Sequence, residues 1–583
     1  MHVPYFDKLL KKTKISSANV LILLSVIVGI TTALGAIGFI MLIKYMNAIF
    51  FGETAKTLTE AVKARGFDWW LLAIPMIGGL FVGPIVFKFA IEAKGHGVPE
   101  VMNAVARLGG IIRPRVAAAK AVASAICIGS GGSAGREGPI VQIGAALGST
   151  IGQMFRMSGE RVKVLVGCGA AAGITSVFNA PIAGVFFSLE IILGDFAIKT
   201  FSPVLISSVV ASVVTRAFLG NHPAFQVPGY TLVSAWEIPL YMIMGIVLGG
   251  LGVMFTKSLD KFEDIFDAMK LPSVYKPAIG GLFLGAIALF FPQILADGYQ
   301  TIRLTLYGKV GIGLMFVLIF LKMLATSFTL GSGNSGGIFA PSLFMGAAAG
   351  GAFGYLMHYL FPQITASQGA YALVGMAGMM AAATHAPMTA ILIIFEMTTD
   401  YRIILPLMMT VVFSTLVSRK LFSHSIYTVK LFRRGIDIKG GKDINILKSH
   451  QVREIMDENF ETIVASTPLA EIFRIIESTN ETYFIVVDKQ EHLKGVITFQ
   501  DIRSILSQHS LDYLIIAQDL IKENTNVLNF DDDLEKAYQM SSIKDLRLIP
   551  VVNEYESNKV IGVVRRDELI DAYNKWLIDT LRK

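Results

Sequence analysis

Long apolar runs constrain this chain of 583 residues more than any other feature of its sequence. A helix needs about 20 mostly apolar residues to cross a bilayer, and runs of that kind recur up to residue 417. Because 53% of the residues are hydrophobic and only 16% are charged, the sequence predicts an α-helical polytopic membrane protein. The runs lie at 19–50, 70–91, 202–218, 236–256, 276–292, 311–330, 369–395 and 402–417.

The charged residues predict the orientation of the chain and limit its partners. Residues 1–17 carry four lysines and no apolar core of their own, so we expect a cytoplasmic N-terminal segment and no secretory signal peptide. Residues 441–583 hold 17 basic and 25 acidic side chains, which leaves 34 basic and 19 acidic on the remaining residues. This charge asymmetry argues against a nucleic-acid partner. We expect a protein of the cell (plasma or inner) membrane with a cytoplasmic tail.

Two glycine-rich loops interrupt the apolar sequence in the same frame. The pattern G-S-G-x-S-x-G-x-x-x-P occurs at 129–139 and again at 331–341. A second pair of segments, 179–190 and 385–396, shares A-P, small residues and a terminal glutamate. Two landmarks in the same order at matching spacing predict a duplicated membrane unit, as in transporters whose broken helices build a site at mid-membrane.

These two loops and a third, at 95–100, each carry a proline that suits the first turn of a following helix. Backbone outside a helix is tolerated at membrane depth only where it is buried in protein or lines a cavity. The unpaired N–H groups at a helix start, together with the helix dipole, favour an anion. Three such helix starts that converge would form an anion site that can also release its ion, as conduction requires.

The three loops resemble the signatures G-S-G-x-P, G-[KR]-E-G-P and G-x-F-x-P of the CLC chloride channels and transporters. They read GHGVP at 95–99, GREGP at 135–139 and GIFAP at 337–341, and the anion-binding tyrosine of the family matches Tyr427. The resemblance implies the CLC fold, with two inverted repeats of broken helices in each subunit. It also implies a homodimer in the lipid bilayer, one pathway for chloride and protons in each subunit, and no required cofactor.

The resemblance implies roles for single residues. Glu137 would be the gate, a carboxylate that imitates the anion in its site and swings away when it binds a proton. Arg136 beside it would be structural and pair with a carboxylate or a carbonyl. The residues expected to bind the anion are His96, Gly97, Gly138, Ile338, Phe339 and Tyr427.

Two positions depart from the family pattern. Ile191 stands where exchangers carry an inner glutamate that passes the proton to the cytoplasm, so proton coupling either uses another route, with the neighbouring Glu190 as a candidate, or is lost. We therefore expect Cl−/H+ exchange gated by Glu137, with a passive, voltage- or pH-gated chloride channel as the alternative. His96 replaces a serine, so its imidazole either coordinates the anion or points away, and fluoride or nitrate remains an alternative substrate.

The acidic tail is itself duplicated. Residues 481–506 and 546–573 both predict strand, turn, strand and helix, after helical segments at 468–478 and 533–541. The pair resembles tandem CBS domains, which are soluble α/β modules that often hold an adenine nucleotide. The predicted boundaries are 1–17 for the N-terminal segment, 18–436 for the membrane domain with repeats at roughly 18–220 and 234–436, 437–449 for a linker, and 450–583 for the CBS pair with copies at roughly 450–510 and 515–583.

A nucleotide site of the CBS kind would lie where the second strand turns into the helix. Thr498 and Asp501 fit that motif in the first copy, and Asp567 fits it in the second copy, where Arg565 replaces the hydroxyl residue. We expect Arg565 to be free to meet a phosphate. The resemblance implies ATP or AMP as a regulatory ligand, with a purely structural dimerising module as the alternative.

Other functional classes lack their motifs in this sequence. None of the nine histidines begins the H-E-x-x-H of a membrane protease, and no Walker A run occurs, so we expect no enzyme and no catalytic residue. A magnesium channel would need carboxylates along its pore, whereas the apolar runs carry few. Cys127 and Cys168 lie among small apolar residues without metal-ligand neighbours, so we expect them to pack in the interior, with no metal site and no disulfide framework.

Overall fold

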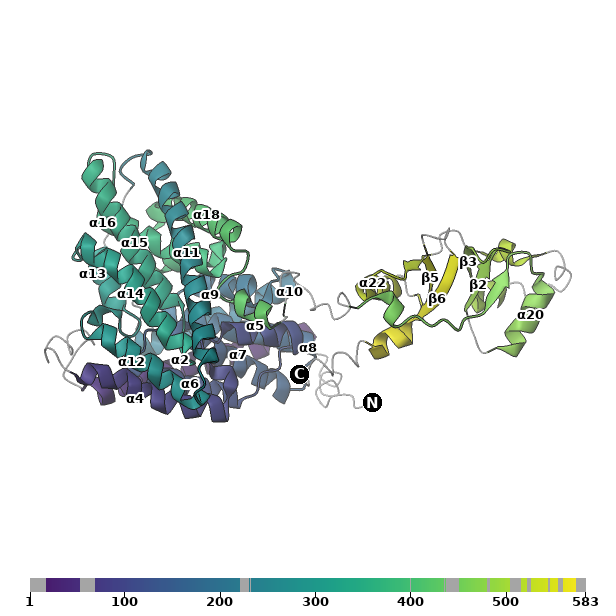
Figure 1. Cartoon of the computed structure of the whole chain (residues 1–583), viewed down its shortest axis with the longest axis horizontal. Coiled ribbons are helices and arrows are strands. Elements are labelled where there is room, and N and C mark those ends of the chain that lie inside the picture. Colours follow the sequence, from purple (N-terminus) through teal and green to yellow (C-terminus); the bar gives the residue numbers. More distant parts are fainter. Residues whose placement is uncertain are drawn as a thin grey trace. The chain divides into compact units, whose positions relative to one another are not determined.

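The structure, a computed structural model, divides into two compact units. The first is Met1–Lys442 and the second is Asp443–Lys583. In their described parts, the first unit consists of helices and loops and the second carries the strands (Figure 1). The described residues are 17–52, 69–220, 230, 232–398, 400–434, 436, 450–479, 483–503, 515–521, 526–543, 546–553 and 559–572.

Eight helices among the described residues are long and apolar enough to cross a membrane. Six of them coincide with predicted apolar runs, which confirms a polytopic α-helical body. The prediction of one span at 369–395 is wrong, because His385, with a φ of 58°, ends one helix and a second helix begins at Pro387. The eight helical segments are Asn19–Phe51, Trp70–Phe89, Gly159–Phe178, Ile198–Leu219, Glu237–Ala268, Ile312–Gly331, Phe339–Leu360 and Tyr401–Leu421.

Two of these helices, α8 (Gly159–Phe178) and α15 (Phe339–Leu360), lie outside the predicted apolar runs. Both are mostly buried inside the protein, and closely packed membrane helices favour glycine and alanine at their contacts. A Cβ atom added to Gly144 of α7 (Glu137–Met154) would lie 2.2 Å from the carbonyl oxygen of Gly169 in α8. Such small residues weaken the apolar signal on which the sequence prediction depends.

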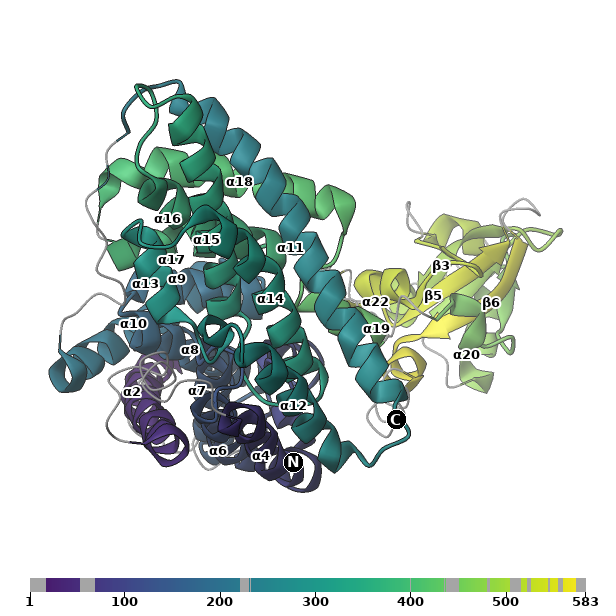
Figure 2. The ribbon, with the colours of Figure 1, turned by 60° about the vertical axis from the view of Figure 1, so that its left-hand side comes forward.

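The helices form two repeats with the same order and the same packing. In the first repeat α7 packs on α8 and α2 packs on α10, and in the second repeat α15 packs on α16 and α11 packs on α18 (Figure 2). The first repeat contains α2 (Ser17–Phe51), α4 (Trp70–Pro84), α5 (Val98–Arg107), α6 (Arg115–Gly129), α7, α8, α9 (Pro181–Phe187) and α10 (Ile198–Leu219). The second contains α11 (Glu237–Ala268), α12 (Lys276–Ala288), α13 (Tyr299–Leu306), α14 (Ile312–Gly331), α15, α16 (Gln368–Thr384), α17 (Pro387–Thr398) and α18 (Ile404–Leu421), followed by α19 (Thr428–Arg433). Short 3-10 and π segments are η1 (Ile85–Phe89), η2 (Ile91–Ala93), η3 (Ser188–Leu193), η4 (Ser273–Tyr275), η5 (Pro292–Ile294) and η6 (Tyr401–Ile403).

Reciprocal contacts relate the two repeats by a local two-fold axis. Gly79 of α4 and its equivalent, Gly281 of α12, lie where these two helices pack together. A Cβ atom added to Gly79 would lie 2.3 Å from the carbonyl oxygen of Pro277, and one added to Gly281 would lie 2.2 Å from that of Pro75. Because Pro75 and Pro277 are also equivalent, each repeat offers the other the same surface that it receives, as a two-fold axis requires.

The second unit contains two sheets of the same topology. In each sheet the first strand pairs parallel with the second, and the second pairs antiparallel with the third. A helix follows the third strand in both, which confirms the predicted order of strand, turn, strand and helix. The strands are β1 (Thr462–Val464), β2 (Tyr483–Val487), β3 (Leu493–Thr498), β4 (Leu528–Asn529), β5 (Leu548–Asn553) and β6 (Lys559–Arg565). The helices are η7 (Val452–Glu454), α20 (Leu469–Ser478), α21 (Phe499–Arg503), η9 (Ala517–Leu520), α22 (Leu534–Ile543) and a helix at 566–572.

The two halves of the second unit share a core and exchange their leading segments. Ile485 and Val487 of β2 pack in one cluster with Leu548 of β5. Val452, which precedes the first half, lies in the core of the second half, and Ala517, which precedes the second half, lies in the core of the first. Each copy of the sequence therefore completes the core of the other, so the pair folds around shared apolar contacts.

Candidate anion site

The three glycine loops meet backbone to backbone at the centre of the first unit. The N–H of Gly135 donates to the carbonyl oxygen of Gly337 at 2.8 Å, and the N–H of Gly337 donates to that of Gly135 at 2.6 Å. These two glycines are equivalent, so the two-fold axis passes through their pair. The third loop joins through Gly95, whose N–H donates to the carbonyl of Asn334 at 2.9 Å and whose carbonyl accepts from Gly336 at 3.2 Å. The predicted convergence of the loops is confirmed.

Helices α5, α7 and α15 each begin at one of these loops. Gly97 precedes α5 with a φ of 82°, a conformation that favours glycine. A Cβ atom added to Gly138 would lie 2.4 Å from the carbonyl oxygen of His96, so only glycine allows the loops to approach so closely. Ile338, which is 1% exposed, precedes α15. The starts of three helices are thus brought together in the protein interior.

Glu137 is fully buried at the start of α7. Its Oε1 accepts a hydrogen bond from the hydroxyl of Tyr299 at 2.5 Å, while its Oε2 has no hydrogen-bond partner among the described residues. The guanidinium of Arg136 lies 5.3 Å from the centre of the Tyr299 ring, so an aromatic ring is one partner of this half-buried cation. Tyr299 lies 162 residues from Glu137 and outside the sequence motifs, so its role was not predicted.

His96 and Tyr427 lie side by side in the same interior. Their ring centres are 5.6 Å apart, and the ring of Phe339 lies 6.3 Å from that of Tyr427. His96 is 5% exposed and Tyr427 is 1% exposed, yet the Nδ1 of His96 and the hydroxyl of Tyr427 have no hydrogen-bond partner among the described residues. Because a buried polar group without a partner costs about 1–3 kcal/mol, such groups indicate a place where a ligand supplies the missing contact.

Two buried lysines, which sequence analysis did not identify, hold the carbonyl groups of the surrounding loops. The Nζ of Lys120 donates to the carbonyl oxygens of Ala93 at 3.0 Å and Gly95 at 2.7 Å. Its equivalent in the second repeat, Lys322, donates to two carbonyl oxygens of the segment 294–296, both at 2.8 Å. Lysine inside an apolar helix is costly, so the recurrence of one at equivalent places in both repeats was the available sequence signal.

Glu190, the candidate proton relay, lies at the start of a helix in the other repeat. Its carboxylate accepts from the N–H groups of Met388 at 3.2 Å and Thr389 at 2.8 Å, where α17 begins. In return Glu396 of the second repeat accepts from the N–H groups of two residues at the start of α9, at 3.0 and 2.7 Å. The two glutamates that sequence analysis paired therefore cap each other's neighbouring helices across the local two-fold axis.

A cavity of about 490 Å³ adjoins the site. Tyr427 forms part of its wall and connects it to the interior where His96 and Phe339 lie. Ile191 also lines this cavity, so the wall is apolar at the position where sequence analysis expected a departure from the family. The lining residues with polar side chains are Glu190, Thr384, His385, Arg419, Ser423, Ser425, Tyr427 and Thr428.

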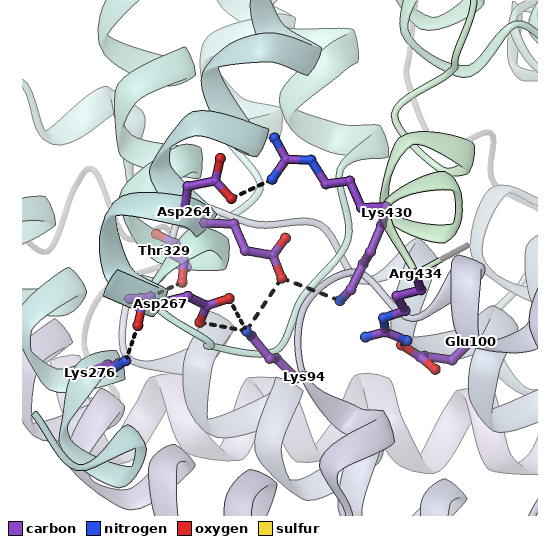
Figure 3. A network of polar contacts seen from close by, with 11 residues as sticks. Lys94, Glu100, Asp264, Asp267, Lys276, Thr329, Lys430 and Arg434 are labelled. Carbon is purple, nitrogen blue, oxygen red and sulfur yellow. Dashed lines mark hydrogen bonds and ion pairs between the residues drawn. The ribbon is translucent and has the colours of Figure 1, made fainter. Parts of the chain in front are cut away.

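A network of ion pairs anchors the segments on both sides of the site (Figure 3). Glu263 of α11 lies 3.4 Å from the Nζ of Lys94, which precedes the first glycine loop, and 3.6 Å from that of Lys430 in α19. Arg434, directly after α19, pairs with Glu100 of α5 at 2.9 Å. Because α19 begins directly after Tyr427, the network fixes this tyrosine relative to the loop that carries His96.

The candidate nucleotide residues lie in the second unit. The Thr498 hydroxyl donates to the Asp501 carboxylate at 2.6 Å, so these two predicted neighbours are in contact, while Asp567 lies exposed in the helix at 566–572. The expectation that Arg565 is free is wrong, because its guanidinium pairs with Asp457, from the exchanged leading segment. A backbone N–H and this guanidinium hold the pKa of the Asp457 carboxyl below its usual range.

These observations define a class: a polytopic membrane protein made of two repeats, in which broken helices meet around buried polar groups. The chain belongs to the CLC family. The family model described as voltage-gated chloride channel matches residues 78–419, and the CBS domain model matches 452–508 and 517–575. The fold is accordingly the CLC fold with two inverted repeats, followed by CBS domains.

Similar proteins align with most of the chain. The chloride channel protein CLC-f of Arabidopsis thaliana is 32% identical over 573 residues, which cover 87% of this chain and 71% of that protein. The H(+)/Cl(−) exchange transporter ClcA of Salmonella paratyphi B is 32% identical over 421 residues, which cover 71% of this chain and 88% of that protein. The crystal structure of a slow cyanobacterial Cl−/H+ antiporter aligns with a TM-score of 0.65 at 27% identity, covering 71% of this chain and 97% of that chain.

Proposed function

We propose that the protein exchanges chloride for protons across the membrane, with Glu137 as the gate. The observation that carries this proposal is the buried Glu137 carboxylate, which lies among the three converging loops and binds the hydroxyl of Tyr299. As a carboxylate it occupies the place of an anion and accepts that hydrogen bond. Once protonated, it loses its charge and its attraction to the helix starts, so anion binding and proton binding are linked through one side chain.

The anion would be held by backbone and side-chain donors near His96 and Tyr427. The ring nitrogen and hydroxyl of these residues have no hydrogen-bond partner in the described part of the chain and suit a monovalent anion. Gly97, Gly138, Ile338 and Phe339 would supply the backbone around it. Each subunit of a homodimer would contain one such pathway. We place the protein in the cell membrane, with the N-terminus and the CBS domains in the cytoplasm.

Liposomes that contain the full-length protein provide the test. An imposed chloride gradient should drive protons against their own gradient in the wild type, while Glu137→Gln should carry chloride without proton movement and without pH dependence. Wild-type proton coupling in Glu137→Gln would remove this residue from the mechanism.

A passive chloride channel is the second candidate. It is favoured by Ile191, which lines the cavity and carries no proton. Chloride flux in the wild type with no proton movement at any pH would identify the channel.

For the tail we propose a regulatory adenine nucleotide that is not required for transport. Thr498 and Asp501 would contact its ribose at the turn from β3 into α21. The hydrogen bond from the Thr498 hydroxyl to the Asp501 carboxylate would weaken when the ribose binds. ATP or AMP should raise the melting temperature of the full chain, and Asp501→Ala should abolish that increase. An absent shift at millimolar nucleotide would leave the CBS pair as a structural module.

A further inference from the structure

His385 ends α16 and lines the cavity beside Tyr427. Its φ of 58° matches the φ of 56° at Asn179, the equivalent residue of the first repeat. Asparagine adopts this left-handed conformation readily, so the helix end does not require a histidine. The titratable ring at this position therefore needs another explanation.

Ser418 determines which ring nitrogen of His385 carries the hydrogen. The Ser418 hydroxyl donates to the carbonyl oxygen of Ala382 at 2.6 Å, so its oxygen is left to accept from the Nε2 of His385, which lies 3.1 Å away. The neutral imidazole then carries its hydrogen on Nε2 and its lone pair on Nδ1. Arg419 donates to the His385 carbonyl at 2.9 Å. The ring and the backbone of this residue are thus both held in place, with Nδ1 as the basic atom.

The other charged and titratable groups of the cavity are less suited to bind a proton. Both oxygens of Glu190 accept from backbone N–H groups at the start of α17, and protonation would take an oxygen away from a donor. Arg419 of α18 stays charged at any accessible pH. Tyr427, before α19, offers a hydroxyl that is already protonated at neutral pH. His385 is the residue of this wall whose ordinary titration range includes neutral pH.

We propose that His385 is the group that binds the transported proton at the cavity end of the exchange pathway. This inference rests on the proposed exchange and assigns to it a residue for the step on the cavity side. Nδ1 takes a proton from a hydronium ion of the solvent, which leaves water, and the imidazolium later gives up the same proton toward Glu137. Glu190 and Arg419 are the charged residues that line the same wall.

The experiment measures proton and chloride fluxes in the same liposomes with the full-length protein. His385→Asn installs the residue that the first repeat uses at the equivalent helix end, so it keeps the left-handed conformation and removes the titration. We expect it to lower the number of protons moved per chloride by roughly 100-fold. His358→Asn is the matched control, because His358 lies in the last turn of α15 on Thr365, outside the cavity wall, and it should keep the wild-type ratio.

Each result decides the inference. A wild-type ratio in His385→Asn overturns the role of His385 and leaves exchange intact. Loss of coupling in Glu190→Gln, together with wild-type coupling in His385→Asn, makes Glu190 the carrier and overturns the inference as well. A wild-type protein that moves chloride without protons overturns the proposed exchange itself and the role of His385 with it. Chloride flux through each variant reports that it is folded.

Discussion

Tyr299→Phe removes the one hydrogen bond that the Glu137 carboxylate accepts from a side chain among the described residues. The bond joins the hydroxyl of the half-buried Tyr299 to a buried carboxylate, and a hydrogen bond to a charged group contributes about 1.5–3 kcal/mol. One pH unit corresponds to about 1.4 kcal/mol. Because the bond favours the ionised carboxylate, its loss should make protonation easier. The pH at which chloride flux is half-maximal should therefore move up by about one to two units.

The assay is chloride efflux from liposomes as a function of external pH. Tyr307→Phe is the matched control, since Tyr307 ends the same helix with an exposed ring, and it should leave the profile in place. In a Glu137→Gln background, Tyr299→Phe should cause no further change, because a neutral amide does not titrate. A profile of Tyr299→Phe that coincides with the wild type would refute the reasoning, and so would a shift to lower pH.

Three further predictions concern packing, the buried lysines and the tail. Gly281→Ala should lower the stability of the protein by about 1–3 kcal/mol, because its Cβ would lie 2.2 Å from the backbone of Pro75. Gly250→Ala in α11, which has open space around it, should not lower the stability. Thermal unfolding in detergent compares the two variants, and equal melting temperatures would contradict the close packing of α4 and α12. Lys120→Met should weaken chloride binding, measured by calorimetry, and destabilise the protein, because two loop carbonyls beside the site lose their donor. An unchanged chloride affinity in a folded variant would show that the ammonium group stabilises only the loop. Asp457→Asn should destabilise the tail above pH about 4, as measured by urea unfolding. The difference in stability from the wild type should shrink as the pH falls through the lowered pKa of Asp457. A difference in stability that persists in acid would rule out the ion pair with Arg565 as its cause.

The sequence by itself was sufficient to predict the membrane class, the duplication, the converging loops and the CBS topology. These features depend on local pattern: apolar length decides which segments can cross a membrane, and backbone outside a helix is tolerated at membrane depth only where it is buried in protein or lines a cavity. The spans α8 and α15 were not predicted from apolar length, because helices buried inside the protein pack with small residues, whereas long apolar runs identify helices that face lipid.

Only the tertiary structure decided which side chains meet. Tyr299 reaches Glu137 from 162 residues away, and Asp457 reaches Arg565 because the two CBS halves exchange their leading segments. His385 lies in a cavity wall that segments of both repeats build together. Contacts of this kind come from the packing of elements distant in sequence, and no spacing of residues along one chain segment encodes them.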